Sequence, residues 1–395
     1  MPTLRKIHTR LASVAPAPPI GFNVDILHTP AAKLPAFTRR PLPAPTAKQV
    51  QPKGVTSQLE EDLKPAARGP TGEFLKACPQ PNVLDIVKWR FRREANQIPR
   101  DLDVLNATLP VLTPDFTAPI PDRHARITWL GHASVLLEVP LPASTDRMTF
   151  LTDAVFSDRC SPSQFFGPAR YRPCPVQVET LPHVDAVLIS HNHYDHMDVI
   201  TLDKLHRAQP HLHWFVPLNN AAYLTAVGIP QAQIHEQNWW DMDPLTKHAS
   251  TFRISCVPAK HWSKRGLNDT NKALWGGWVV QGLGGSFYFV GDTAYDSFFD
   301  AIHHRFGDQS VSAIPIGAYA PRNLFTYQHV NVDEAVQIHR DVRSRASVGI
   351  HWGTWELTDE FYLEPKQELA RQMAQDPASF VALDHGAHKV VPWTL

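Results

Sequence analysis

The chain has 395 residues, of which 43% are hydrophobic, and this is enough material for a large buried core. Lys plus Arg equals Asp plus Glu at 38 each, and the formal net charge of zero argues against a nucleic-acid-binding protein. No apolar run reaches the roughly 18–20 residues that cross a bilayer, and we expect neither a membrane span nor a secretory signal. The widely spaced cysteines predict reduced thiols in an intracellular, reducing compartment: Cys78, Cys160, Cys174 and Cys256.

Residues 1–70 are rich in proline, alanine and basic side chains. Residues 1–58 carry eight basic side chains and a single acidic one, Asp25. Such a composition buries too little apolar surface to offset chain entropy, so we predict a mostly disordered arm. Its charge fits a mitochondrial targeting segment or an arm that meets anionic lipid, and an unstructured tail without an address is the open alternative.

Residues 81–93 predict a basic amphipathic helix. At helical spacing Leu84, Val87 and Phe91 share an apolar side. Charge comes from Lys88, Arg90, Arg92 and Arg93. Such a helix lies at a membrane surface or packs on its own domain, and packing is the favoured interpretation.

From residue 126 onward strand and helix patterns alternate. A first β-rich series covers residues 127–139, 149–153, 184–190, 212–218 and 252–259. A second covers residues 275–282, 286–292, 312–318, 347–351 and 380–383, and helical periodicity marks residues 332–343 and 364–375. The two series predict an α/β protein with two stacked sheets and helices outside, in one domain over residues 71–395.

The run LISHNHYDHMD, residues 188–198, places four ligand-type side chains in one loop directly after an apolar strand: His191, His193, Asp195 and His196. Imidazole nitrogens suit zinc and iron, and a carboxylate among them can hold a second cation. In open α/β sheets the loop after a strand is the usual place for chemistry. The run therefore predicts a metal site.

Three later segments also end a strand with a metal-type residue: His261, Asp292 and His351. Each is a weak signal alone, because the chain has 21 histidines. Their shared position at strand ends, together with the loop at 191–196, makes them candidates for the same site.

The motifs GHAS (131–134), HNHYDH (191–196) and GDT (291–293), with the later histidines, resemble the metallo-β-lactamase fold superfamily. The resemblance implies a four-layer αββα sandwich with a two-metal site between the sheets. It implies two Zn2+ per chain, held by two groups and one bridging carboxylate: His191, His193 and His261; Asp195, His196 and His351; and Asp292.

Longer blocks between Trp129 and Pro365 are more specific, above all SPSQFFGP (161–168) and the segment 312–340. Over roughly residues 78–392 they closely resemble the N-acyl-phosphatidylethanolamine-hydrolysing phospholipase D family. This resemblance implies hydrolysis of that phospholipid, at a peripheral membrane surface, to an N-acylethanolamine and phosphatidic acid. We hypothesise in-line attack of a metal-bound hydroxide on phosphorus, with Asp292 orienting the hydroxide and managing its proton.

His329 matches a family residue placed near the substrate phosphate. It could donate a hydrogen bond to a phosphoryl oxygen or protonate the departing oxygen, and the alternative is an ordinary loop histidine. Tyr194 and Gln328 are expected as further polar residues that bind substrate. Aromatic residues in segments near the site could line the acyl chains: Phe165, Phe166, Trp239, Trp240, Trp262 and Phe325.

Two other functions stay open at this point. One is a different hydrolase on the same fold, such as a sugar-phosphate lactonase, and the other is a non-catalytic lipid-binding or metal-binding protein. A nuclease is disfavoured, because residues 59–395 are acidic overall. The acyl-chain preference and the oligomeric state, including a homodimer, are not determined by these motifs.

Overall fold

The structure, a computed structural model, describes residues 55–93 and 97–394. The chain divides into two units, Met1–Gln51 and Pro52–Leu395. The disordered arm predicted for residues 1–70 therefore lies mainly outside the described residues. Its described part is structured: helix α1 spans Val55–Asp62, and the amide of Ala66 donates to Asn238 Oδ1 at 3.0 Å. Trp240 donates its indole N–H to the carbonyl of Asp62, so contacts far along the chain order this segment despite its composition.

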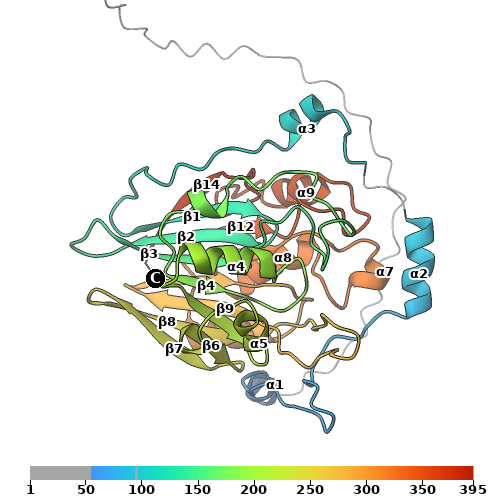
Figure 1. Ribbon diagram of the computed structural model, residues 1–395, viewed down its shortest axis with the longest axis horizontal. Coiled ribbons are helices and arrows are strands. Elements are labelled where there is room, and N and C mark those ends of the chain that lie inside the picture. Colours follow the sequence, from blue (N-terminus) through green and yellow to red (C-terminus); the bar gives the residue numbers. More distant parts are fainter. Residues whose placement is uncertain (1–54, 94–96, 395) are drawn as a thin grey trace, which may run out of the picture. The chain divides into compact units, whose positions relative to one another are not determined.

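The strands of the described residues form two seven-stranded sheets (Figure 1). The first has the order β14-β1-β2-β3-β4-β5-β6, and its strands span His388–Pro392, His124–Gly131, Ser134–Pro140, Arg147–Thr152, Ala186–Leu188, His213–Pro217 and Ile234–Gln237. The second has the order β13-β12-β11-β10-β9-β8-β7, and its strands span Phe380–Val381, Ser347–Ile350, Val311–Pro315, Gly285–Phe289, Gly277–Gly282, Ser250–Val257 and Met242–Lys247.

The two sheets pack face to face through one apolar core. Phe150 of β3 and Phe252 of β8 are both fully buried, and their ring centroids lie 5.6 Å apart. Burial of both faces explains why strands such as β4 read as unbroken apolar runs. The prediction of stacked sheets is therefore confirmed, but residues 252–259, which the sequence pattern groups with the first series, form β8 of the second sheet.

Helices cover both outer faces of the sheets. The remaining α-helices of the described residues are α2 (Val83–Arg92), α3 (Leu102–Thr108), α4 (Val199–Ala208), α5 (Ala221–Thr225), α6 (Phe298–Phe306), α7 (Arg322–Phe325), α8 (Val332–Asp341) and α9 (Glu364–Gln372). Leu202 of α4 and Leu224 of α5 pack with Trp214 of the first sheet, whereas Ile338 of α8 and Leu369 of α9 join the core of the second. The four-layer αββα sandwich is thus present.

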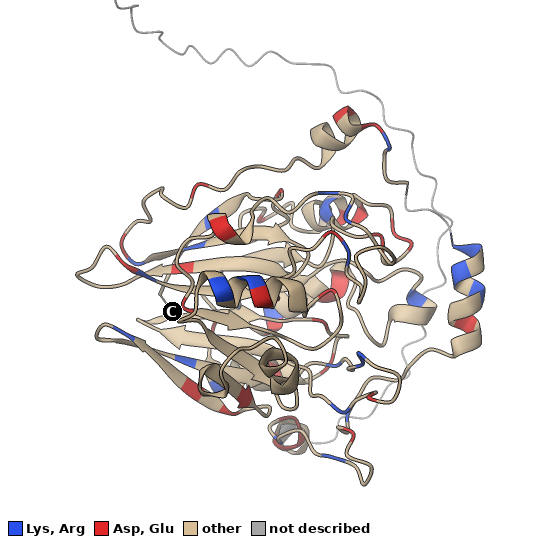
Figure 2. Ribbon diagram, in the orientation of Figure 1, with Lys and Arg blue, Asp and Glu red and all other residues tan. Residues whose placement is uncertain are grey.

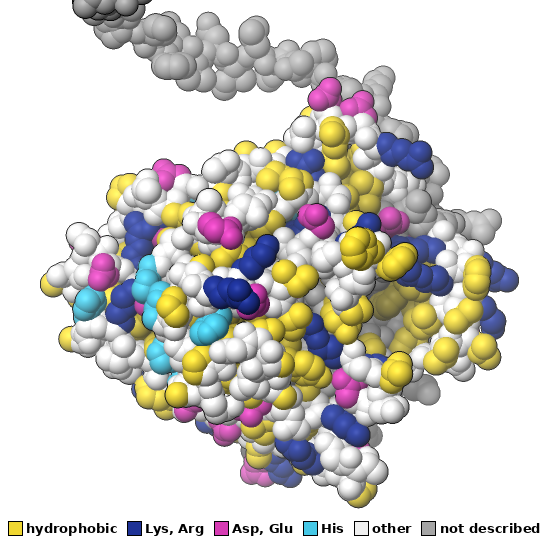
Figure 3. Space-filling view, in the orientation of Figure 1, with side chains coloured by type: hydrophobic (Ala, Val, Ile, Leu, Met, Phe, Trp, Pro, Cys, Tyr) yellow, Lys and Arg dark blue, Asp and Glu magenta, His cyan; other side chains and the backbone are white. Residues whose placement is uncertain are grey.

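Helix α2 forms where the sequence predicts it, but it packs differently from the favoured interpretation. None of its residues is buried, and the side chains of Val83, Leu84 and Phe91 are 75%, 65% and 87% exposed. The helix touches the domain through Trp89, whose ring lies edge-on to Phe325 at 5.2 Å. Figure 2 colours the Lys and Arg positions along the ribbon of α2, and Figure 3 shows a hollow between this helix and the rest of the chain. The apolar side of the helix is thus left unpacked.

Candidate metal centre

The loop with four ligand-type side chains begins where β4 ends. Its backbone makes a helical turn, because the amides of His196 and Met197 both donate to the carbonyl of His193. This turn gathers the ligand-type side chains of His191, His193, Asp195 and His196. Asp198 then accepts from the amide of Ile200 and begins α4, so the loop is held at both ends.

A first group of three imidazoles meets at the start of this loop. His193 Nδ1 lies 2.8 Å from His191 Nε2 and 3.2 Å from His261 Nε2. Burial lowers the pKa of His193 to about 4 and lowers the pKa values of His191 and His261 well below the usual range. Neutral imidazoles present the lone pairs that a metal ion needs.

A second group lies beside the first. His196 Nε2 is 3.2 Å from His351 Nε2 and 3.3 Å from Asp195 Oδ2. Burial opposes charge on His351, but Asp292 and Asp195 outweigh it and raise the pKa of His351 to about 9. Burial alone would raise the pKa of Asp195, whereas the neighbouring His196 and His132 hold it well below the usual range. The carboxylate therefore stays ionised.

Asp292 lies between the two groups. Its Oδ2 is 3.2 Å from His196 Nε2 and 3.7 Å from His261 Nε2, and its Oδ1 is 3.0 Å from His351 Nε2. The residue follows β10 after a turn at Gly291, whose backbone has φ of +67°. The structure thus brings all seven predicted ligand residues together at one edge of the sandwich.

The donor set fits metal ions better than it fits a hydrogen-bond network. In three pairs of imidazoles the ring nitrogens face one another at 2.8–3.2 Å, so that ligand atoms from several rings converge on one small volume. A buried cluster of imidazoles and ionised carboxylates of this kind is a metal-binding site.

Two residues that the sequence analysis did not assign also reach the centre. His132, in the GHAS turn, places Nε2 3.0 Å from Asp195 Oδ2, and burial lowers its pKa to about 3. Asp153 follows β3, and its Oδ2 lies 2.6 Å from His196 Nδ1. Two features of the sequence could have indicated these residues: His132 belongs to the GHAS motif, and Asp153 ends the strand pattern at 149–153.

His329 lies at the centre, on the side of Asp292. Its Nδ1 is 3.7 Å from Asp292 Oδ2, and its ring centroid is 5.3 Å from those of His261 and His351. Nδ1 is buried without a hydrogen-bond partner. Burial lowers the pKa of His329 to about 4, so the ring is neutral near pH 7 and carries one N–H.

Gln328 and Tyr194 have other partners in the structure. The carbonyl oxygen of the Gln328 side chain accepts from the indole of Trp262 at 2.9 Å. Tyr194 donates its hydroxyl to the carbonyl of Arg265 at 3.0 Å, and the Arg265 guanidinium lies 4.2 Å above its ring. Arg265 also donates to the carbonyls of residues 192 and 197. Tyr194 thus belongs to a contact that ties the loop 191–196 to the segment after His261.

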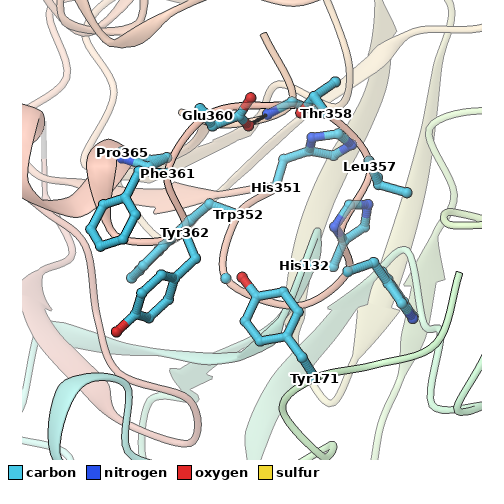
Figure 4. Close-up of a pocket in the computed structure, with 13 residues that line it drawn as sticks. His132, Tyr171, His351, Trp352, Leu357, Thr358, Glu360, Phe361, Tyr362 and Pro365 are labelled. Atoms are coloured by element: carbon cyan, nitrogen blue, oxygen red, sulfur yellow. Dashed lines mark hydrogen bonds between the residues drawn. The ribbon is translucent and has the colours of Figure 1, made fainter. Parts of the chain in front are cut away.

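The wall behind the second group is aromatic and tightly packed. A cavity of about 20 Å³ lies beside His132 and His351, with Trp352 and Tyr171 among its lining residues (Figure 4). A space of this size holds about one water molecule. Glu360 fixes the wall by accepting from the amides of residues 318 and 320. A phospholipid therefore has no room on this side of the centre.

The aromatic residues expected near the site divide into two sets. Trp239 and Trp240 are buried in the apolar core. Phe165 and Phe166 are 85% and 76% exposed, and Trp262 packs on His193 with centroids 4.6 Å apart. Phe325 also lies beside the centre, with its ring centroid 6.3 Å from that of His329. The residues free to meet a substrate are therefore Trp262, Phe325 and the exposed Phe165 and Phe166.

Comparison with known proteins identifies the family. Residues 148–352 match the family model described as a beta-lactamase superfamily domain. The chain is 39% identical over 348 residues to N-acyl-phosphatidylethanolamine-hydrolyzing phospholipase D 1 of Caenorhabditis elegans, covering 83% of this chain and 94% of that protein. It is 32% identical to the mitochondrial enzyme of the same name in Saccharomyces cerevisiae, and the match covers 71% of this chain and 65% of that protein. The chain belongs to the N-acyl-phosphatidylethanolamine-hydrolysing phospholipase D family of the metallo-β-lactamase fold superfamily.

Proposed function

We propose that this protein is a zinc-dependent phospholipase D that hydrolyses N-acyl-phosphatidylethanolamine to an N-acylethanolamine and phosphatidic acid. The observation that carries the proposal is the convergence of seven His and Asp side chains in a chain that matches the Caenorhabditis elegans enzyme over 94% of its length. A complete ligand set argues against a non-catalytic relic. The segment 312–340, which a lactonase does not need, supplies His329 beside the centre.

Two Zn2+ ions are the metal content that the two groups favour. Imidazole and carboxylate donors without a thiolate suit zinc, and each group offers at least three such donors when Asp292 is shared. Bound there, a pair of divalent cations lowers the pKa of a water molecule and neutralises charge on phosphoryl oxygens. We assign His191, His193 and His261 to one ion, Asp195, His196 and His351 to the other, and Asp292 to both.

His329 and Asp292 supply the remaining chemistry from the protein. Neighbouring imidazoles outweigh the effect of burial and hold the pKa of Asp292 well below its usual range, so its carboxylate can accept a hydrogen bond from the attacking water and orient it. The neutral His329 donates its single N–H to a phosphoryl oxygen of the substrate. The unpartnered Nδ1 of His329 and its place 3.7 Å from Asp292 support this role.

The substrate is a membrane lipid, and α2 supplies a surface for docking on a bilayer. Its exposed apolar side chains and the basic Lys88, Arg90 and Arg92 match the acyl boundary and the anionic headgroups, respectively. Arg93 is excluded from this surface, because it pairs with Asp359 at 3.1 Å. No helix in residues 55–93 or 97–394 has the length and hydropathy to cross a membrane. We therefore propose peripheral binding.

A mitochondrial location remains part of the proposal. The basic segment before residue 54 has the composition of a targeting segment, and the Saccharomyces cerevisiae relative is described as mitochondrial. Expression of the full chain and of a chain lacking residues 1–54, followed by organelle fractionation, tests this location. Equal distribution of the two proteins would contradict it.

Mass spectrometry of reaction products tests the proposed activity. The purified protein is incubated with a defined N-acyl-phosphatidylethanolamine, with a sugar-phosphate lactone in a parallel reaction, before and after chelation. We expect N-acylethanolamine and phosphatidic acid in equal amounts, loss of both after chelation, and recovery on addition of Zn2+. Lactone opening without phospholipid cleavage would favour the lactonase function, and no turnover of either would favour a binding protein.

A further inference from the structure

A second set of histidines lies on the first sheet, outside the metal centre. His213 begins β5, and His235 lies on the neighbouring strand β6, which is the edge strand of this sheet. Figure 3 shows histidine side chains gathered on one part of the surface. None of the proposed chemistry uses them.

The contact between these two rings has the geometry found in the metal centre. His213 Nδ1 and His235 Nε2 face each other at 3.1 Å, against 2.8–3.2 Å for the imidazole pairs of the centre. Imidazole nitrogens bound at about 2.0–2.1 Å to one tetrahedral ion lie about 3.3–3.4 Å apart. A shift of a few tenths of an ångström therefore makes room for an ion between the two rings.

The surroundings of His235 prepare it as a ligand. Its other nitrogen, Nδ1, lies 3.4 Å from Asp243 Oδ2, and a carboxylate in this position favours the proton on Nδ1 and leaves the lone pair on Nε2. The same relationship joins Asp153 to His196 in the metal centre. His235 also stacks on Phe215, with centroids 4.3 Å apart and planes 7° apart, which fixes the direction of its ring.

The pair is distinct from the metal centre. His213 is paired in register with Ala186, at the start of β4, whereas His191 follows the end of that strand. Five residues of extended chain separate these positions, or roughly 16 Å. The side chain of His235 is 23% exposed, so an ion can reach the pair from solvent.

We propose that His213 and His235 form a separate binding site for one divalent transition-metal ion. The two imidazoles chelate the ion, water completes its coordination, and Asp243 holds His235 in the required tautomer. Because the ligands come from adjacent strands, the bound ion clips the edge strand β6 to β5. Binding of the ion stabilises the folded state by an amount that grows with the logarithm of the free ion concentration above the Kd, and the site takes no part in hydrolysis.

Equilibrium dialysis against increasing free Zn2+ tests the site in the zinc-loaded enzyme. We expect the wild type to bind one more ion per chain than His213→Gln or His235→Gln, while the tightly bound zinc and the hydrolytic rate stay the same in all three. Asp243→Asn keeps both ligands and should bind the additional ion about 10–100-fold more weakly. His248→Gln is the matched control, because His248 is an exposed histidine paired with Asp146 outside this site.

Electron paramagnetic resonance provides a second measurement. One equivalent of Cu2+ added to the zinc-loaded wild type should give a signal with two coordinating nitrogens, and His235→Gln should lose it while circular dichroism shows the same folded content. Equal Zn2+ binding and equal Cu2+ spectra in the wild type and both glutamine variants would overturn the proposal. The close contact would then be an N–H···N hydrogen bond.

Discussion

Asp153 and His196 form a fully buried pair in which Asp153 Oδ2 lies 2.6 Å from His196 Nδ1. Ser190 donates its amide and its hydroxyl to the same carboxylate at 2.7 and 2.6 Å. The carboxylate is thus anchored to the start of the ligand loop, and it directs the opposite nitrogen of His196 toward Asp292 and His351. The pair connects the end of β3 to the metal centre.

Substituting Asp153→Asn should weaken metal binding. The neutral side-chain amide of asparagine replaces the charged carboxylate that accepts the hydrogen bond from His196 Nδ1. We expect retention of the metal to fall about 10–100-fold, as measured by competition with a chelator. Asp146→Asn, at an exposed carboxylate paired with His248, is the control and should retain metal like the wild type. Unchanged retention in Asp153→Asn would show that the pair does not tune the centre.

Substituting His329→Ala should separate catalysis from metal binding. We expect turnover of N-acyl-phosphatidylethanolamine to fall about 10²–10³-fold, because the hydrogen bond to the phosphoryl oxygen is lost. Metal content, measured by elemental analysis, should stay at the wild-type value. Tyr327→Ala removes an exposed neighbouring ring and serves as the control. Normal turnover would eliminate the catalytic role, and loss of metal would make the role of His329 structural.

Substituting Leu84→Ser together with Phe91→Ser should reduce binding to vesicles that contain anionic lipid. We expect a decrease of roughly tenfold or more in a flotation assay, since burial of a Leu or Phe side chain is worth about 1.5–3 kcal/mol. Hydrolysis of a substrate dispersed in detergent should stay unchanged, because α2 contains no residue of the metal centre. Leu102→Ser, an equally exposed apolar position on α3, is the control, and equal loss in both would contradict a specific role for α2.

Substituting Glu138→Gln should destabilise the fold without touching the metal centre. Glu138 and Arg126 are each only 1% exposed and form two hydrogen bonds of 2.6 and 2.8 Å, and Arg147 donates to the same carboxylate. Loss of the charge leaves the buried Arg126 uncompensated, and we expect the free energy of unfolding to fall by about 3–5 kcal/mol in urea titrations. Glu61→Gln breaks an exposed pair with Lys64 and should have little effect on the same measurement.

Substituting His339→Asn should reduce the pH dependence of stability. His339 lies on the buried side of α8, near Ser347 and Phe380, and burial lowers its pKa from 6.5 to about 4. Its neutral form is therefore favoured in the folded state, and stability present above pH 6.5 is lost as the pH falls toward 4. By linkage this loss is about 2 kcal/mol at pH 5. Urea titrations above pH 6.5 and at pH 5 measure this loss of stability. The His339→Asn variant should not show it, whereas His304→Asn, at an exposed histidine, should show it like the wild type.

The sequence alone predicted the ligand loop and the order of layers. His191, His193, Asp195 and His196 are neighbours along the chain, so a single turn after β4 is sufficient to collect them. The apolar strand patterns predicted the sheets, since burial on both faces leaves unbroken apolar runs. His261, Asp292 and His351 were predicted as candidates because strand ends meet at one edge, and their roles came from the family resemblance.

Other features depend on contacts between segments far apart in the sequence. Strand β14 pairs antiparallel to β1, although more than 250 residues separate them, and its sequence pattern did not predict it. Tyr194 turns toward Arg265, and Asp153 toward His196, because of hydrogen-bond partners that local periodicity does not encode. Helix α2 was predicted from apolar residues that recur every 3.6 residues, but this spacing does not determine which surface the apolar side of the helix contacts. The sequence by itself determined which groups carry the chemistry, and the tertiary structure decided which partners orient them, because orientation is set by long-range packing and hydrogen bonding.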